Sequence, residues 1–161
     1  MKLSPAIKGV ITASVMIAIS LITYYSGLPP NSPFQYLIYA VYALGITWTV
    51  VAYRNSASFT GKFGALFNQG FRCFIVVTLL MVAFTGIFSK MHPEFAEESA
   101  KLYKEELVLN AKAKTPSDIE TDVARYKKGY TLALIYGSIF GYLIIGAAVT
   151  AATSLLLTRR K

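Results

Sequence analysis

The chain has 161 residues, of which 55% are hydrophobic, and its formal net charge is +8. Its single cysteine excludes an internal disulfide and a metal cluster held by several cysteines. An excess of basic residues is also found in nucleic-acid-binding proteins, but no basic-aromatic motif accompanies it here, so we expect no nucleic-acid partner.

The distribution of charge separates membrane from non-membrane segments. All eight acidic residues lie between Glu94 and Asp122. Outside that stretch there are four long apolar runs, at about 7–25, 34–53, 71–88 and 130–157. Each approaches the roughly 20 residues that a helix needs to cross a bilayer, and each is apolar on all faces. The sequence therefore predicts an all-α membrane protein: a single-domain four-transmembrane-helix bundle with an external helical segment at about 90–128, before the last span.

The first apolar run follows Lys2 and Lys8, as in a secretory signal peptide. It is longer than a typical signal-peptide core, and no small-residue cleavage motif follows it, so we expect an uncleaved first span. The next connection, residues 26–33, has three prolines within five residues. Since proline cannot continue a helix, this segment predicts a turn that makes the first two spans antiparallel.

The second connection carries an aromatic stripe. Four phenylalanines recur at every fourth residue, with two basic residues among them: Phe59, Lys62, Phe63, Phe67, Phe71 and Arg72. A spacing of four places the rings on one face of a helix. This pattern predicts a helix in the membrane interface, which contacts lipid headgroups or a partner. The alternative is a connecting helix that floats on the membrane and binds nothing specific.

The segment before the last span has the composition of a soluble helix. Its apolar residues Phe95, Leu102 and Leu109 recur every seven residues and predict a face for a partner. The sequence Thr-Pro-Ser-Asp at 115–118 predicts a helix start with a capping box. If Gly129 does not break it, the last helix runs from about 116 to 157. Two helices joined near 112–115 would then form an external amphipathic helical hairpin, packed on itself, the bundle or a partner.

Catalytic chemistry has few candidate residues. The four spans contain no Asp, Glu, Lys, Arg or His away from their ends, whereas proton-coupled transport and intramembrane proteolysis usually require an ionisable group or a nucleophile–base pair at membrane depth. His92 beside Glu94 is a poor metal-ligand set, because one histidine without a cysteine supplies too few ligands. Acidic residues such as Glu97 and Glu98 are favoured at a helix N-terminus without any catalytic role. We therefore expect no enzymatic activity, no catalytic residue, no metal and no cofactor.

The last span contains the best packing motif. Gly137 and Gly141 form a GxxxG sequence, and small residues including Ala148 follow it. Small residues let helix backbones approach closely, so these three residues predict a helix–helix contact. The contact is either internal to the bundle or a seam between two copies of the chain.

The arrangement of Lys and Arg predicts the orientation. Lys and Arg are equally numerous on the two sides of the membrane when residues 90–128 are included in the count. The first helix usually dominates, and every segment on the N-terminal side is basic without any acid. We therefore expect both termini in the cytoplasm and residues 90–128 in the periplasm.

Residues 63–72 read Phe-Gly-Ala-Leu-Phe-Asn-Gln-Gly-Phe-Arg and lead into the third span. With four spans and a large external segment before the last one, the chain resembles the bacterial membrane family called domain of unknown function 4199. The similarity covers nearly the whole chain. It implies a protein of the bacterial inner membrane, and it transfers no activity to particular residues.

Three hypotheses for the function follow. The first is an accessory or assembly subunit of a larger membrane complex, because catalytic groups are lacking and an amphipathic external segment is present. The second is a lipid-handling or flippase-like helper in a polyprenyl-linked glycan pathway, which would use the aromatic stripe. The third is a channel or transporter that oligomerises around a pore. The expected partners are membrane lipids and other integral-membrane proteins, or further copies of the chain.

Overall fold

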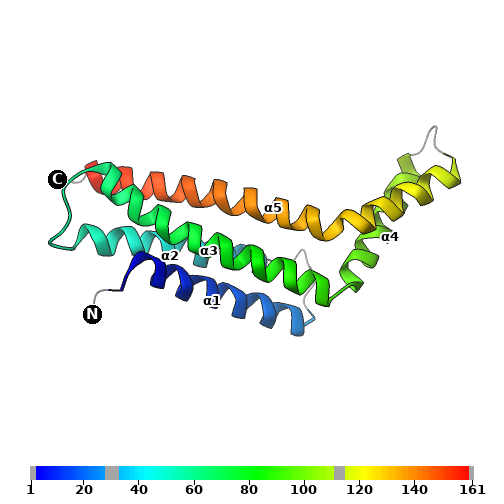
Figure 1. Cartoon of the computed structure of the whole chain (residues 1–161), viewed down its shortest axis with the longest axis horizontal. Helices are drawn as coiled ribbons and strands as arrows, with labels where there is room; N and C mark the ends of the chain where they lie inside the picture. Colours follow the sequence, from blue (N-terminus) through cyan, green and yellow to red (C-terminus); the bar gives the residue numbers. More distant parts are fainter. Residues whose placement is uncertain (1–2, 28–32, 111–114, 160–161) are drawn as a thin grey trace. The chain divides into compact units, whose positions relative to one another are not determined.

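The computed structural model describes residues 3–27, 33–110 and 115–159 (Figure 1). These residues form five helices and no strand: α1 (Pro5–Tyr25), α2 (Phe34–Arg54), α3 (Phe63–Met91), α4 (Glu94–Asn110) and α5 (Pro116–Arg159). Four of them, α1, α2, α3 and α5, are long and apolar enough to cross a membrane. The expected all-α class is thus confirmed for the described residues, and the four long apolar helices are consistent with the expected multi-pass membrane protein. Most of the proline-rich connection and of the junction at 112–115 lies outside the described residues.

Two helices start at the caps that their sequences encode. In α1 the hydroxyl of Ser4 accepts a hydrogen bond from the backbone N–H of Ile7 at 3.3 Å. In α5 the backbone N–H of Thr115 donates to the carboxylate of Asp118 at 3.1 Å, and the N–H of Asp118 donates back to the Thr115 hydroxyl at 3.3 Å. This reciprocal pair is the expected capping box. The helix that it starts is 44 residues long and continues through Gly129 without a break, as expected.

The interfacial helix expected from the aromatic stripe is not a separate element. α3 starts at Phe63 and continues without interruption to Met91, whereas Phe59 precedes it in the connection. Gly70 is buried inside α3 and does not bend it into a new direction. A Cβ added at Gly70 would lie 3.0 Å from a methyl carbon of Val50, so this glycine permits close packing. Phe63, Phe67 and Phe71 are thus helical, as expected, but they belong to the helix of the third span, and their place in the membrane interface stays a prediction.

The chain divides into two compact units. The first unit comprises residues 1–82 and 139–161, and the second comprises residues 83–138. In the first unit α1, α2, the beginning of α3 and the end of α5 lie side by side (Figure 1). The start of α1, the connection between α2 and α3, and the end of α5 all lie at the same end of this unit (Figure 1).

Glycines set the helix contacts of the first unit. A Cβ added at Gly9 of α1 would lie 2.8 Å from the backbone carbonyl oxygen of Cys73 in α3. One added at Gly45 of α2 would overlap the side chain of Thr12 in α1. One added at Gly146 of α5 would lie 2.8 Å from the Phe74 ring and would overlap the Tyr42 hydroxyl. Because lipid gives helices no hydrophobic reason to associate, such close approaches supply the van der Waals contact that holds spans together.

Large side chains fill the space between these contacts. Tyr42, Ile46, Leu66 and Val77 are fully buried in the first unit. The Tyr42 hydroxyl donates to the backbone carbonyl of Tyr142 at 3.0 Å, and the two rings meet edge to face with their centroids 5.5 Å apart. This hydrogen bond satisfies the one polar atom of the buried Tyr42 side chain.

The small-residue contact of the last span lies elsewhere than the sequence indicated. A Cβ added at Gly137 or Gly141 would meet no atom within 4 Å in the part of the chain that the structure describes, and Ala148 is exposed. The internal contact uses Gly146 instead, since it faces Tyr42 and Phe74. The prediction of an internal contact at these three residues was therefore wrong. The alternative, a seam between two copies of the chain at these residues, stays a prediction.

The second unit has its own contacts. The ring of Tyr103 in α4 stacks on that of Tyr126 in α5, with their centroids 4.5 Å apart and 17° between their planes. Lys127 of α5 donates to the carboxylate of Glu97 in α4 at 2.8 Å. Ala100 of α4 is buried. One face of α4 thus packs against the beginning of α5.

Replacement of Gly146 by alanine tests the packing of the first unit. We expect Gly146→Ala to destabilise the fold by about 1–3 kcal/mol, because the added carbon overpacks the contact with Tyr42 and Phe74. Gly141→Ala is the matched control on the same helix, and it should leave stability unchanged or raise it, because alanine favours a helix more than glycine does. Unfolding in detergent, followed by circular dichroism, measures both. Equal effects of the two variants would contradict this packing.

Candidate functional site

A cleft opens at one end of the first unit. It encloses about 470 Å³. Residues from α1, α2, the following connection and α3 line it: Leu3, Pro5, Lys8, Trp48, Thr49, Ala52, Tyr53, Asn55, Ser56, Ser58 and Gln69. Lys8 is the one charged residue among them, so we refer to this site as the Lys8 cleft. It lies at the end of the unit where α1 begins and α2 ends.

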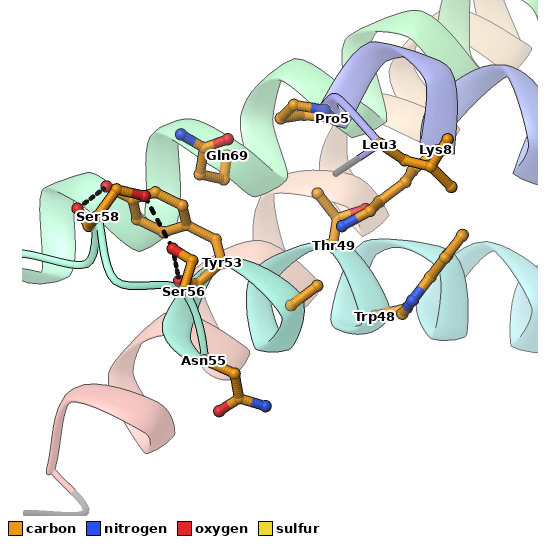
Figure 2. A pocket seen from close by; sticks show the side chains of 11 residues that line it. Leu3, Pro5, Lys8, Trp48, Thr49, Tyr53, Asn55, Ser56, Ser58 and Gln69 are labelled. Carbon is orange, nitrogen blue, oxygen red and sulfur yellow. Dashed lines mark hydrogen bonds between the residues drawn. The ribbon is translucent and has the colours of Figure 1, made fainter. Parts of the chain in front are cut away.

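Lys8 is held inside the first turns of α1. Ser4 caps the helix and Pro5 opens it, so Lys8 lies in the helix instead of in a tail that precedes it. Its side chain extends towards α2 near Thr49 and Trp48 (Figure 2). The Lys8 Nζ lies 5.2 Å from the centroid of the Trp48 ring, within the range of a cation–π interaction. The residue is 8% exposed, so the amine is accessible mainly through the cleft.

Hydroxyl groups form the opposite wall of the cleft. The Ser56 hydroxyl donates to the backbone carbonyl of Tyr53 at 2.7 Å and lies 2.9 Å from the Ser58 hydroxyl (Figure 2). The Tyr53 hydroxyl donates to the backbone carbonyl of Ser58 at 3.2 Å. These bonds fix the connection after α2 against the end of that helix. Gln69 adds a carboxamide from α3. Because each hydroxyl proton is used in one of these bonds, the amine of Lys8 and the carboxamide of Gln69 are the donors that the cleft offers to an anion.

The sequence did not predict this cleft. Lys8 was treated as a charge that precedes the first span, and residues 55–58 were treated as part of a connection. The helix-start signal Ser4-Pro5 was nevertheless present, and it places Lys8 inside the helix. Its approach to Trp48 depends on how α1 packs on α2, which the sequence does not encode locally.

The predicted aromatic stripe is present on α3 but is separate from the cleft. The Phe63 and Phe67 rings stack with their centroids 5.8 Å apart, and Phe67 stacks on Phe71 at 6.4 Å. Phe59 packs on the ring of Tyr53 instead. Lys62 and Arg72 are both exposed, and none of the six stripe residues is among those that line the cleft.

The predicted partner face on α4 is partly exposed. Leu102 is 63% exposed and Leu109 is 85% exposed. Phe95 differs from these two because it is half-buried, and its ring lies 6.0 Å from that of Phe88. The exposed apolar face of α4 therefore contains Leu102 and Leu109, whereas Phe95 packs within its own unit.

His92 and Glu94 form a close pair outside the predicted spans. The His92 Nδ1 lies 2.7 Å from a carboxylate oxygen of Glu94. The His92 ring also packs on that of Phe88, with the centroids 4.4 Å apart. Among the residues that the structure describes, no group of three or more His, Cys, Asp or Glu side chains is placed to hold a metal ion.

Comparison with known families gives one match. The model of the family described as protein of unknown function (DUF4199) matches residues 8–159. The chain therefore belongs to this family, in agreement with the resemblance noted in its sequence. No curated protein and no solved structure matches the chain.

The pairing of Glu97 with Lys127 predicts a titration that can be measured directly. The hydrogen bond from Lys127, together with its positive charge, lowers the pKa of the Glu97 carboxyl below its usual value. A carboxyl whose pKa is lowered by folding stabilises the fold above its unfolded-state pKa, and this contribution disappears as the pH falls through the folded-state pKa. We expect Lys127→Met to raise the pKa of Glu97 towards the ordinary value, as measured by carbon NMR of the side-chain carboxyl.

The neighbouring variant Lys128→Met is the control for that titration. It removes the same charge from an exposed lysine one residue away, and it should change the Glu97 pKa much less. If both variants change the Glu97 pKa equally, the general positive charge of α5 and not the bond to Lys127 sets it.

Proposed function

We propose that this DUF4199 protein is a small non-catalytic accessory or assembly subunit of a larger membrane complex, and that it binds a protein partner through α4. The observation that carries the proposal is the exposure of Leu102 and Leu109. α4 is not one of the four helices with the length and hydropathy of a membrane span. Large leucines on such a helix favour a protein surface that covers them.

The two faces of α4 have different roles in this proposal. Ala100 and Tyr103 belong to the face that packs on α5. Leu102 and Leu109 are seven residues apart, so they lie on nearly the same face of the helix. Covering one fully exposed leucine side chain contributes about 1.5–3 kcal/mol. Two such residues one above the other supply the i and i+7 anchors by which an amphipathic helix docks in a groove of a partner.

We also propose how the helices are arranged in the membrane. The four spans pack as a bundle in a bacterial inner membrane, and α4 with the beginning of α5 forms an external helical hairpin. Both termini face the cytoplasm and α4 faces the periplasm. The basic residues of the cytoplasmic side, including Arg54, Lys62 and Arg72, support this orientation, because positive residues are retained on that side.

A lipid-handling role is the second candidate. The observation that favours it is the stacked row of Phe63, Phe67 and Phe71 beside the exposed Arg72. Aromatic rings next to a cation suit the boundary between lipid headgroups and acyl chains. In this role the first turns of α3 would guide a lipid, and α4 would need no partner.

Site-specific photo-crosslinking in native membranes tests the accessory role. A photoreactive residue at Leu102 or Leu109 should give a covalent adduct with one particular protein, because these positions would be covered by the partner. The same residue at Lys104 is the control, since Lys104 is exposed on α4 but is polar. Mass spectrometry of the adducts identifies the partner. Adducts with lipid alone at both leucines would contradict the proposal and favour the lipid-handling role.

A further inference from the structure

Lys8 is buried where a lysine would ordinarily reach water. A lysine near the end of a membrane-spanning helix usually extends its side chain so that the amine lies at the aqueous interface. Lys8 instead turns towards α2, with its Nζ 5.2 Å from the centroid of the Trp48 ring. Exposure of 8% for the residue means that most of the side chain is removed from solvent. The amine is thus placed at the wall of the cleft.

The first unit has no acidic side chain that could balance this cation. Residues 1–82 and 139–161 include no aspartate or glutamate, because all eight acids lie between Glu94 and Asp122. Among the described residues, no ion pair involves Lys8. A buried charge is retained in proteins when an opposite charge or several polar groups compensate it. The Trp48 ring compensates only part of the charge, so the rest is left to whatever occupies the cleft, and an anion from outside the unit would compensate it best.

The cleft has the size and the groups to admit such an anion. About 470 Å³ exceeds the volume of a single small ion and falls within the range of sites that hold a small organic group. Besides the amine of Lys8, the wall carries the hydroxyls of Ser56 and Ser58 and the carboxamide of Gln69. An ammonium group binds phosphate as a point charge, and the carboxamide N–H groups of Gln69 can donate to a remaining oxygen. The Ser56 and Ser58 hydroxyls, whose protons are used within the connection, add only polarity to the wall.

We propose that the Lys8 cleft binds the phosphate group of an anionic phospholipid, with Lys8 as the counter-charge. The cleft lies between the start of α1 and the end of α2, two helices long and apolar enough to cross a membrane. In a bilayer that they cross, these helix ends would lie near the headgroups. Basic pockets between spans on one side of a membrane bind lipid headgroups in this manner. Trp48 is 44% exposed and offers an apolar surface beside the amine for the glycerol and upper acyl chain.

The same phosphate chemistry is found in soluble phosphate esters, so the source of the ligand must be tested. A lipid is favoured because its acyl chains remain in the bilayer, which keeps the headgroup at a high local concentration near the cleft. A soluble ester would have to bind with its phosphate contacts alone. This site is independent of α4, so it can exist with or without a protein partner there.

The single tryptophan of the chain reports on the site. Trp48 is the only tryptophan, and it lies against Lys8, so an anion that binds Lys8 should change its fluorescence. The full chain, purified in dodecyl maltoside, is titrated separately with phosphatidylglycerol, with phosphatidylcholine and with glycerol 3-phosphate. We expect a saturable change with phosphatidylglycerol, a much weaker change with phosphatidylcholine and none with glycerol 3-phosphate at the same concentrations.

Three lysine variants assign the binding to Lys8. Lys8→Met should raise the phosphatidylglycerol concentration at half-saturation at least about tenfold, since a charge-assisted hydrogen bond is lost. Lys128→Met removes the same charge from an exposed lysine outside the first unit, and it should change this concentration less than about twofold. Lys8→Arg keeps the charge and should bind within about threefold of the native chain, which separates loss of charge from loss of fold.

Thermal unfolding of the same proteins gives a second readout. Phosphatidylglycerol should raise the melting temperature of the native chain, because a ligand that binds only the folded state stabilises it. It should have little effect on Lys8→Met. Three results would overturn the proposal: equal responses to phosphatidylglycerol and phosphatidylcholine, binding of glycerol 3-phosphate alone, or equal losses in Lys8→Met and Lys128→Met.

Discussion

Close approach of helix backbones at glycines is the constraint on which the first unit depends. Spans surrounded by lipid gain no hydrophobic free energy from contact with one another, so they associate where small residues allow many atoms to touch. Gly9 brings α1 against Cys73 of α3, Gly45 brings α2 against Thr12 of α1, and Gly146 brings α5 against Tyr42 and Phe74. These contacts position the start of α1 beside the end of α2. The Lys8 cleft results from that position, because its walls come from both helices and from α3.

The same packing leaves a charge without an internal partner. Acidic residues are confined to a part of the chain that lies outside the first unit, so the amine of Lys8 faces only the Trp48 ring and neutral polar groups. A cation so placed is costly to keep buried unless an anion arrives from elsewhere. The uneven distribution of charge that identifies the spans in the sequence is therefore also the reason to expect a ligand at the cleft. α4 has an uncovered apolar surface in place of an uncompensated charge. Leu102 and Leu109 are exposed there, on a helix that is not one of the four candidate spans.

The features that depend on residues close together along the chain could be predicted from the sequence. The apolar runs predicted four spans, and Thr115 with Asp118 predicted the start of α5, because hydropathy and capping are local properties. Contacts between helices were not predicted. The GxxxG pair at Gly137 and Gly141 was the most conspicuous motif, yet the close approach is at Gly146, because the rotation of α5 against its neighbours decides which small residue faces inwards. Lys8 was missed for the same reason, since only the packing of α1 on α2 places it over Trp48.

The most direct test of the account is a measurement of the distance between the Lys8 amine and phosphorus. Solid-state NMR can detect dipolar coupling between a ¹⁵N-labelled lysine amine and the ³¹P of phosphatidylglycerol bilayers, and the difference from Lys8→Arg isolates the Lys8 signal. The account predicts a lipid phosphorus within about 4 Å of the Lys8 Nζ, as in a charge-assisted hydrogen bond. A Lys8 amine that shows no coupling to phosphorus, in a chain folded in the same bilayer, would contradict it.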